Sequence, residues 1–206
     1  MFGNGLFVSI EGGEGSGKSA LIQGLSRYLK AQGIECITSR EPGGIKVAEE
    51  IRELIMGNEM DAITEALLFA SARREHFKNK ILPALEKGKV VICDRFVDSS
   101  IVYQGYVQGV GMESVLNINS QALEGLIMPH MTLYLDVEPT VALNRIAQNN
   151  RETNRFDEKS MDFHSKVRDG YLLIEKEYSN RIKKIDASLS KEEVLSQAIE
   201  YVKTLL

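Results

Sequence analysis

The sequence has little of the chemistry that marks secreted or membrane-spanning proteins. It contains only two cysteines, Cys36 and Cys93, and neither has a Cys or His neighbour at the short spacing of a metal site. They are typical of small apolar core residues in a reducing compartment. The chain also lacks a signal-peptide pattern and any apolar run of about 18 residues. We therefore expect a soluble, cytoplasmic protein without a membrane partner.

Histidine is also scarce, and the 25 basic residues are outnumbered by 29 acidic ones. The formal net charge is -4, and no basic tract occurs. This argues against general nucleic-acid binding, although a local arginine cluster could still hold a small anionic ligand. The three histidines are isolated, so no Ser-His-Asp arrangement is readable, and they are interpreted as surface or packing residues.

Strand and helix patterns alternate along the chain. With 206 residues and 43% hydrophobic content, the sequence favours one α/β domain over 1–206. The alternation predicts right-handed crossovers and a parallel five-stranded sheet covered by helices on both faces. The expected strands are 6–10, 35–39, 90–93, 131–137 and 183–186. The expected helices are 20–29, 47–56, 62–86, 112–127, 139–149, 158–180 and 190–205, with Pro83 bending or shortening the third and Gly88 ending it.

A glycine-rich motif lies between the first expected strand and the first helix. Its glycines let the backbone wrap closely around an anion, so that amide groups and the helix N-terminus point at phosphates. The lysine adds positive charge near the β- and γ-phosphates, and the hydroxyl that follows faces Mg²⁺. The eight residues fit G-x-x-x-x-G-K-[ST] and are the candidate ATP-binding loop: Gly12, Gly13, Glu14, Gly15, Ser16, Gly17, Lys18 and Ser19.

Two other interpretations of this motif fit less well. A flexible turn needs no Lys18. The dinucleotide-binding fingerprint, which 15–20 formally fits, expects an acid at the end of the second strand, where Arg40 stands.

The third expected strand ends in Asp94 and Arg95. A buried strand that ends in an acid is typical of the second phosphate site of P-loop proteins, where Asp94 would hold Mg²⁺ or its water. Arg95 could reach a transferring phosphoryl group. A surface Asp-Arg pair is the alternative. The short polar segments 98–100 and 103–106 follow the same strand end.

Phe69 and Arg73 lie four residues apart in an expected helix and so share one face. An aromatic ring beside a forked donor could stack on a base and hydrogen-bond its carbonyl edge. Ordinary core packing is the alternative. Further along, 148–157 is polar and contains Arg151 and Arg155, which predicts a mobile loop between two helices.

Taken together, the motifs resemble thymidylate kinases of the bacterial type. The resemblance covers nearly the whole chain, and its most specific parts are the REPGG and DR-x-x-DSS-x-x-YQG segments. The segments that carry it include 10–19, Arg40-Glu41-Pro42-Gly43-Gly44, 49–52, 69–76, Asp94-Arg95-Phe96-Val97-Asp98-Ser99-Ser100, Tyr103-Gln104-Gly105-Tyr106 and 133–137.

This resemblance implies a P-loop kinase that phosphorylates dTMP to dTDP with ATP and Mg²⁺, in dTTP biosynthesis. By resemblance, Phe69 stacks on thymine, Arg73 reads its carbonyl, and Glu14 faces the sugar 3′-hydroxyl. A homodimer is also implied. The substrate-binding residues so expected are Glu14, Glu41, Arg52, Phe69, Arg73, Arg95, Ser100 and Gln104; the catalytic ones are Lys18, Asp94, Arg95, Arg151 and Arg155; the metal ligands are Ser19 and Asp94.

Members of the family differ in where they place one arginine. Some have it directly after the P-loop acid, where this chain has Gly15, and others supply it from a closing lid. Arg151 and Arg155 are therefore lid candidates within 148–157, and the sequence does not decide between them. Two alternatives stay open: a kinase for another nucleoside monophosphate or a deoxynucleoside, and a nucleotide-binding regulatory ATPase.

Overall fold

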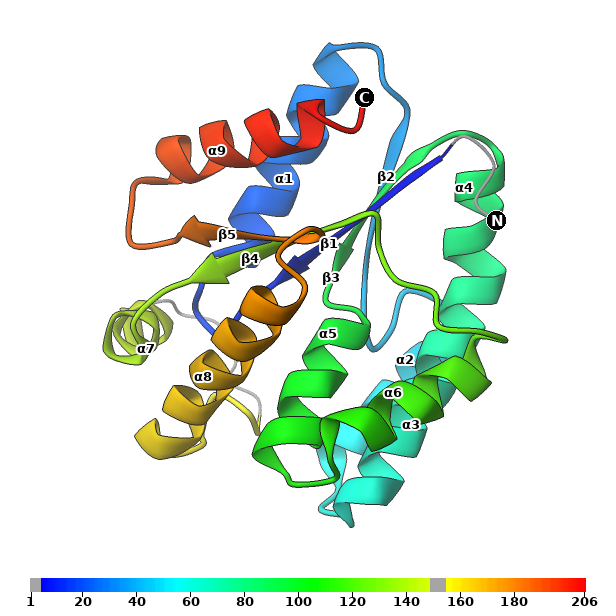
Figure 1. The fold of residues 1–206 in the computed structure, drawn as a ribbon, viewed down its shortest axis with the longest axis vertical. Coiled ribbons are helices and arrows are strands. Elements are labelled where there is room, and N and C mark those ends of the chain that lie inside the picture. The colour runs from blue at the N-terminus through cyan, green and yellow to red at the C-terminus, as the bar shows by residue number, and fades with distance from the viewer. Residues whose placement is uncertain (1–4, 149–154) are drawn as a thin grey trace.

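The computed structural model describes residues 5–148 and 155–206. Its strands and helices alternate along the chain as the sequence pattern predicts (Figure 1). In chain order they are β1 Leu6–Glu11, α1 Lys18–Ala31, β2 Cys36–Arg40, α2 Lys46–Gly57, α3 Ala62–His76, η1 Phe77–Ile81, α4 Leu82–Glu86, β3 Val90–Asp94, α5 Val97–Ser100, η2 Ile101–Val107, α6 Met112–Ala122, β4 Met131–Asp136, α7 Pro139–Gln148, α8 Met161–Glu177, β5 Ile182–Asp186 and α9 Lys191–Lys203.

The five strands form one parallel sheet in the order β2-β3-β1-β4-β5. The predicted fold class is therefore confirmed. Parallel strands bring their carboxyl ends to one edge, so the turns after β1 and β3 start side by side, with Ile10 opposite Asp94. The central strand β1 also lies where the strand order reverses, which is the place where open α/β sheets bind ligands.

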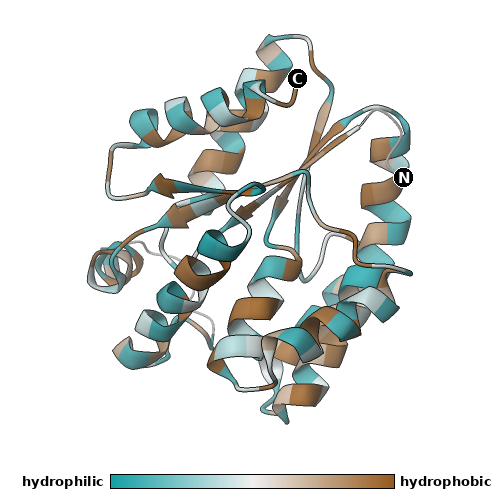
Figure 2. Cartoon of the chain, in the orientation of Figure 1, coloured by the Kyte–Doolittle hydropathy of each residue, from teal (hydrophilic) through white to brown (hydrophobic). Residues whose placement is uncertain are grey.

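Alternate strand residues face two separate hydrophobic cores. Ile10 and Ile92 belong to the core shared with α1 and α9, whereas Phe7, Val91 and Tyr134 belong to the core on the opposite face. Figure 1 shows α1 and α9 on one side of the sheet and α3, α5, α6 and α8 on the other. In Figure 2 the strands are largely brown, as expected for a parallel sheet buried on both faces.

The expected helix over 62–86 is continuous but changes its geometry before Pro83. The turn formed by η1, Phe77–Ile81, is π-helical, and Pro83 lies at the start of α4. Proline has no N–H, and its ring collides with the carbonyl four residues earlier, so a widened turn accommodates it. Gly88 has φ 73° and its N–H donates to the Leu85 carbonyl at 2.9 Å. It ends the helix as predicted.

The sequence pattern does not predict the helix formed by α5 and η2, over 97–107. Its polar residues are short and look like those of a loop, yet Asp98, Ser100 and Gln104 are almost fully buried. Their hydrogen-bond partners come from distant parts of the chain, which a local pattern cannot show. The helix expected to begin at residue 158 begins instead at Met161, because the hydroxyl of Ser160 caps α8.

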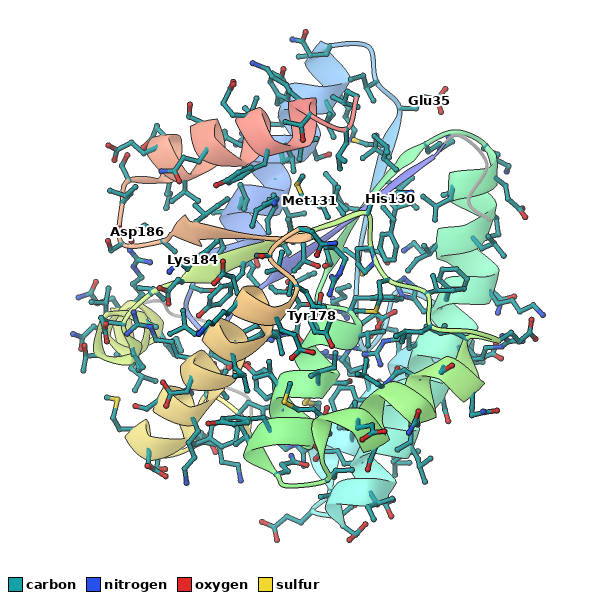
Figure 3. The ribbon with its side chains drawn as sticks, viewed as in Figure 1. Glu35, His130, Met131, Tyr178, Lys184 and Asp186 are labelled. Carbon is teal, nitrogen blue, oxygen red and sulfur yellow. The ribbon has the colours of Figure 1, made fainter. Side chains whose placement is uncertain are left out.

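None of the described helices is long and apolar enough to cross a membrane. Cys93 is buried in β3 and Cys36 is half-buried in β2, and both thiols are free. His130 comes just before β4, beside Met131 (Figure 3), and its Nδ1 accepts a hydrogen bond from the Phe7 amide at 2.9 Å.

A buried ion pair connects Asp98 in α5 to Arg181, which comes just before β5. The carboxylate of Asp98 is fully buried and accepts from both Nη atoms of Arg181, at 2.7 and 2.8 Å, and from the Thr132 hydroxyl at 2.7 Å. The Arg181 guanidinium also lies over the ring of Tyr178, which Figure 3 labels. Asp98 therefore serves the interior rather than the strand-end site where the sequence pattern suggested it.

We expect Asp98→Ala to lower the free energy of unfolding by about 3 kcal/mol, because it leaves the largely buried charge of Arg181 without its partner. Urea unfolding followed by circular dichroism at pH 7 measures the loss. Glu200→Ala is the control, since its pair with Lys203 is exposed and should contribute less than about 1 kcal/mol. Equal effects from the two changes would contradict the structural role of Asp98.

Candidate active site

The glycine-rich loop connects β1 to α1 at the carboxyl edge of the sheet. Gly17 caps α1 with φ 96°, a left-handed conformation that favours glycine. At Gly15, φ is +74° and an added Cβ would lie 2.3 Å from the carbonyl oxygen of Ala142 in α7. No side chain fits there, which gives a packing reason for the lack of an arginine after the P-loop acid.

Lys18, the first residue of α1, folds back over the loop. Its Nζ donates to the carbonyls of Gly12 and Gly13, at 3.2 and 2.9 Å. Burial lowers the pKa of Lys18 from its ordinary value, and the nearby Arg95 lowers it further, whereas Asp94 acts in the opposite direction. The arrangement places the Lys18 amino group over the loop, where a bound phosphate would accept hydrogen bonds from it.

The residues expected to hold Mg²⁺ fit that role. Asp94 Oδ1 is buried, and in the described part of the chain it has no hydrogen-bond partner. Asp94 and Ser19 line the same open hollow, of about 1200 Å³. Mg²⁺ prefers oxygen ligands. The unpartnered carboxylate oxygen of Asp94 and the hydroxyl of Ser19 are therefore a suitable pair of ligands.

A second pocket, of about 550 Å³, lies next to the loop. It brings together all eight residues expected to bind the acceptor substrate, from six of the segments named in the sequence. Six further residues line it. Pro42, Phe96, Ser99 and Tyr103 belong to segments that carry the resemblance, Phe156 belongs to the expected loop over 148–157, and Met56 gave no signal in the sequence. The full lining is Glu14, Glu41, Pro42, Arg52, Met56, Phe69, Arg73, Arg95, Phe96, Ser99, Ser100, Tyr103, Gln104 and Phe156.

Arg73 is held from several directions at the base of this pocket. Its Nε donates to Glu41 at 2.6 Å, one Nη to Asn119, and the other Nη to the Phe96 carbonyl and the Ser100 hydroxyl, both at 3.1 Å. A guanidinium has five N–H donors. Four are used here, and one on Nη1 has no acceptor among the described residues.

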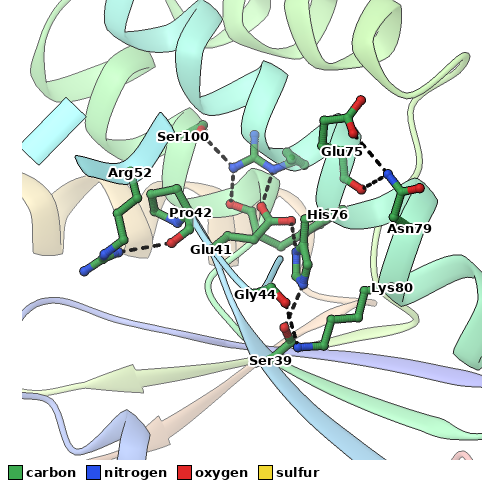
Figure 4. A network of polar contacts seen from close by, with 12 residues as sticks. Ser39, Glu41, Pro42, Gly44, Arg52, Glu75, His76, Asn79, Lys80 and Ser100 are labelled. Atoms are coloured by element: carbon green, nitrogen blue, oxygen red, sulfur yellow. Dashed lines mark hydrogen bonds and ion pairs between the residues drawn. The ribbon is translucent and has the colours of Figure 1, made fainter. Parts of the chain in front are cut away.

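The partner of Arg73, Glu41, is itself held by a buried chain of hydrogen bonds. Its second oxygen lies 2.9 Å from Nδ1 of His76, whose Nε2 lies 2.7 Å from the Ser39 hydroxyl (Figure 4). Glu41, His76 and Cys93 are close enough together to suggest a metal site. However, burial raises the pKa of the Cys93 thiol well above its ordinary value, and both ring nitrogens of His76 are already hydrogen-bonded. We interpret the group as a polar core.

An ion pair links the loop to the acceptor pocket. Arg95 Nη2 donates to Glu14 at 2.8 Å, and the Tyr103 hydroxyl donates to the other oxygen of Glu14 at 2.7 Å. Although burial alone would raise the pKa of Glu14, Arg95 and Lys18 lower it below its ordinary value. Arg95 has φ 68°, an uncommon conformation for a residue with a Cβ. Such strain is often found where a side chain must be aimed at a ligand.

Beneath this pair lies Glu11, the last residue of β1, which is fully buried. One oxygen accepts from the Phe96 amide at 2.7 Å, and the other accepts from the Ser99 and Tyr171 hydroxyls. Ser99 in turn accepts from Arg95 at 3.0 Å. Burial, and then the nearby Asp98, raise the pKa of Glu11 to about 7, against the lowering effect of Arg95. Tyr171, in α8, carried no sequence signal for this contact.

Most of the expected lid lies outside the described residues, as does Arg151. Arg155 is described, and its guanidinium bonds Glu65 and the Asn58 carbonyl and lies over the ring of Phe156. In this arrangement Arg155 is on the acceptor side rather than over the glycine-rich loop.

Comparisons with known proteins point to one family. A family model described as thymidylate kinase matches residues 10–198. A thymidylate kinase of Clostridium novyi (strain NT) is 48% identical over 97% of this chain and 98% of its own length. One of Geobacillus thermodenitrificans (strain NG80-2) is 49% identical over 97% and 90%. A crystal structure of thymidylate kinase from Ehrlichia chaffeensis is 31% identical, with a TM-score of 0.78 over 97% of this chain and 99% of that one.

The raised pKa of Glu11 makes stability depend on pH. Between about pH 4.5 and 7 the folded protein holds this proton and the unfolded chain releases it. The free energy of unfolding should therefore fall as pH rises through this window, by up to about 3 kcal/mol. Glu11→Gln, which mimics the protonated form, should remove that loss when urea unfolding is measured from pH 5 to 8.

Glu53→Gln is the matched control, because Glu53 is exposed on α2 and should leave the pH dependence as it is in the parent protein. If the Glu11→Gln protein still lost stability over the same window, Glu11 would not be the titrating group.

Proposed function

The chain belongs to the thymidylate kinase family and is an ATP-dependent dTMP phosphotransferase, and from this premise we propose the role of each group around its two hollows. The observation that carries the proposal is the single pocket in which all eight expected acceptor residues meet, next to the glycine-rich loop. A regulatory ATPase needs only the loop. A second pocket with an aromatic ring and buried arginine side chains fits an acceptor nucleotide.

In the proposed acceptor site, the thymine ring stacks on Phe69, and Arg73 donates its remaining N–H to a carbonyl of the base. Ser100 and Gln104 contact the same edge of the base. This assignment is supported by burial: Arg73 is 2% and Gln104 1% exposed, so their polar groups offer hydrogen bonds in a site with little competing water.

The acceptor phosphate is proposed to lie between Arg52 and Arg95. Arg52 lines the pocket and donates to the Pro42 carbonyl at 3.2 Å, and Arg95 is anchored by Glu14. Two guanidinium groups with fixed positions would orient the phosphate oxygen for in-line attack on the γ-phosphorus. Glu14, also in the pocket, is proposed to face the sugar hydroxyl.

The donor is proposed to bind with its phosphates in the glycine-rich loop, where backbone amides and Lys18 neutralise their charge. Ser19 and Asp94 would hold Mg²⁺, which when bound offsets negative charge on the β- and γ-phosphates. Lys18 would exchange its contacts with Gly12 and Gly13 for phosphate oxygens. The barrier to phosphoryl transfer falls mainly through alignment and charge neutralisation, and these groups supply both.

We further propose that the described residues act as one nucleoside monophosphate kinase domain, since one sheet carries both hollows. The lid over 148–157, with Arg151 or Arg155 reaching the phosphates, stays a prediction, as does the cytoplasmic location.

A homodimer is proposed on the exposed apolar surface of two neighbouring helices. On α2, Val47 and Leu54 are 45% and 48% exposed; on α3, Ile63 and Leu67 are 54% and 49% exposed. Their spacings of seven and four place each pair on one helix face. Exposed apolar side chains grouped in this way are typical of protein interfaces. In a two-fold dimer the same surface of a second copy of the chain would cover them.

The reaction is tested by measuring ADP release with dTMP, dUMP, dCMP, dGMP and thymidine as acceptors. We expect the highest kcat/KM with dTMP. Lys18→Ala should lower turnover at least about a hundredfold at unchanged thermal stability, because it removes a positive charge that stabilises the transition state. ATP hydrolysis that does not depend on any acceptor would instead favour a regulatory ATPase.

The dimer is tested by sedimentation. The double change Leu54→Glu with Leu67→Glu should convert the protein to a monomer, because two charges on each side of the contact would have to be buried. Leu173→Glu is the control, since Leu173 is similarly exposed, at 45%, but lies on α8. If the parent protein sediments as a monomer, or if only the control dissociates it, this interface is wrong.

A further inference from the structure

Glu65 is a buried acid behind the acceptor pocket that the proposed mechanism does not use. It lies in α3, one turn before Phe69, and is 3% exposed. It does not line the pocket. A buried acid is costly unless its oxygens are satisfied, so its partners show what it does.

Three side chains donate to Glu65. The Nε2 atoms of Gln104 and Gln108 donate to one oxygen, at 2.8 and 2.7 Å, and the Arg155 guanidinium donates to the other. Gln104 lies in η2, and Gln108 is the residue that ends it. The carboxylate thus collects donors from two other segments.

The contact with Gln104 fixes which end of its amide faces the base. An amide has a donor end and an acceptor end, whereas a carboxylate only accepts. The nitrogen of Gln104 must therefore face Glu65. No described residue donates a hydrogen bond to the Gln104 side-chain oxygen. This oxygen is also not one of the fully buried atoms that lack a partner. Since Gln104 lines the pocket, this oxygen is what it offers to a ligand.

Arg73 and Gln104 then present a fixed pattern to the base: one N–H donor and one carbonyl acceptor. Thymine and uracil have the complementary edge, a carbonyl oxygen beside a ring N–H. Cytosine has the reverse, an amino group beside a ring nitrogen that accepts. If the Gln104 amide were turned over, its nitrogen would suit the ring nitrogen of cytosine instead.

We propose that Glu65 sets the base selectivity of the acceptor pocket by holding the amide nitrogen of Gln104, so that only the amide oxygen faces the base. This inference rests on the proposed acceptor site. Glu65 is a positioning residue, because it acts through Gln104 and does not touch the substrate.

The test is Glu65→Gln, assayed with dTMP, dUMP and dCMP. A glutamine of the same shape both donates and accepts, so it no longer dictates the orientation of the Gln104 amide. We expect the ratio of kcat/KM for dTMP to that for dCMP to fall at least about tenfold, because sites with fixed hydrogen-bonding groups discriminate strongly and freely turning ones do not. The value for dUMP should fall together with that for dTMP, since both bases have the same edge.

Gln108→Leu is the matched control. It removes the other amide from the same oxygen of Glu65 and leaves the contact with Gln104, so the ratio should stay within about twofold of the parent value. In a Gln104→Leu background, Glu65→Gln should change the ratio no further, as expected if Glu65 acts only through Gln104.

The outcomes separate this inference from the proposed function. A parent protein that did not prefer dTMP and dUMP over dCMP would overturn the proposed function itself. A parent with that preference, together with a Glu65→Gln variant that lost activity by the same factor on all three nucleotides, would overturn only the role of Glu65. If Glu65→Gln does not fold, Glu65→Asp withdraws the carboxylate from Gln104 and should lower the same ratio; an unchanged ratio there would also overturn the proposal.

Discussion

The pairing of β1 with β3 is the constraint on which the site depends. Their parallel register brings Ile10 opposite Asp94, so the glycine-rich loop and the turn containing Arg95 leave the sheet side by side. Glu11 then fixes the second turn to the first strand by accepting from the Phe96 amide. Backbone groups at a strand end need partners. This bond and that from the Arg95 amide to the Ile10 carbonyl, at 3.0 Å, hold the chain where it leaves β3.

Two opposite charges are buried and paired along this junction, whereas Oδ1 of Asp94 has no hydrogen-bond partner among the described residues. Glu14 and Arg95 neutralise one another between the loop and the pocket, with Tyr103 donating to the same carboxylate. Breaking such a pair leaves an isolated charge in the interior, which costs more than the pair contributes. The site is therefore rigid at the point where donor and acceptor phosphates would meet, and the left-handed backbone at Arg95 is maintained by these contacts.

A similar arrangement holds the side chains of the pocket that we propose to read the base. Arg73 is held by Glu41 and Asn119, and Gln104 is held by Glu65, so the groups that meet a ligand are oriented before it arrives. Ordering long side chains in advance lowers the entropy that binding must otherwise remove. In the proposed acceptor site, selectivity would then depend also on residues that do not touch the substrate, because they decide which donors and acceptors remain free.

The sequence by itself determined the elements whose cause is local. Periodic apolar residues predicted the five strands, Gly88 marked a helix end, and the spacing of 12–19 placed the loop between strand and helix. Phe69 and Arg73 could be assigned to one helix face for the same reason. Resemblance supplied the eight acceptor residues but not their contacts. Only the tertiary structure decided that the polar residues over 97–107 form a buried helix, that Tyr171 reaches Glu11, and that Glu65 holds Gln104. These depend on partners far away in the chain, and a buried polar side chain looks the same in a sequence as an exposed one until its hydrogen-bond partner is known.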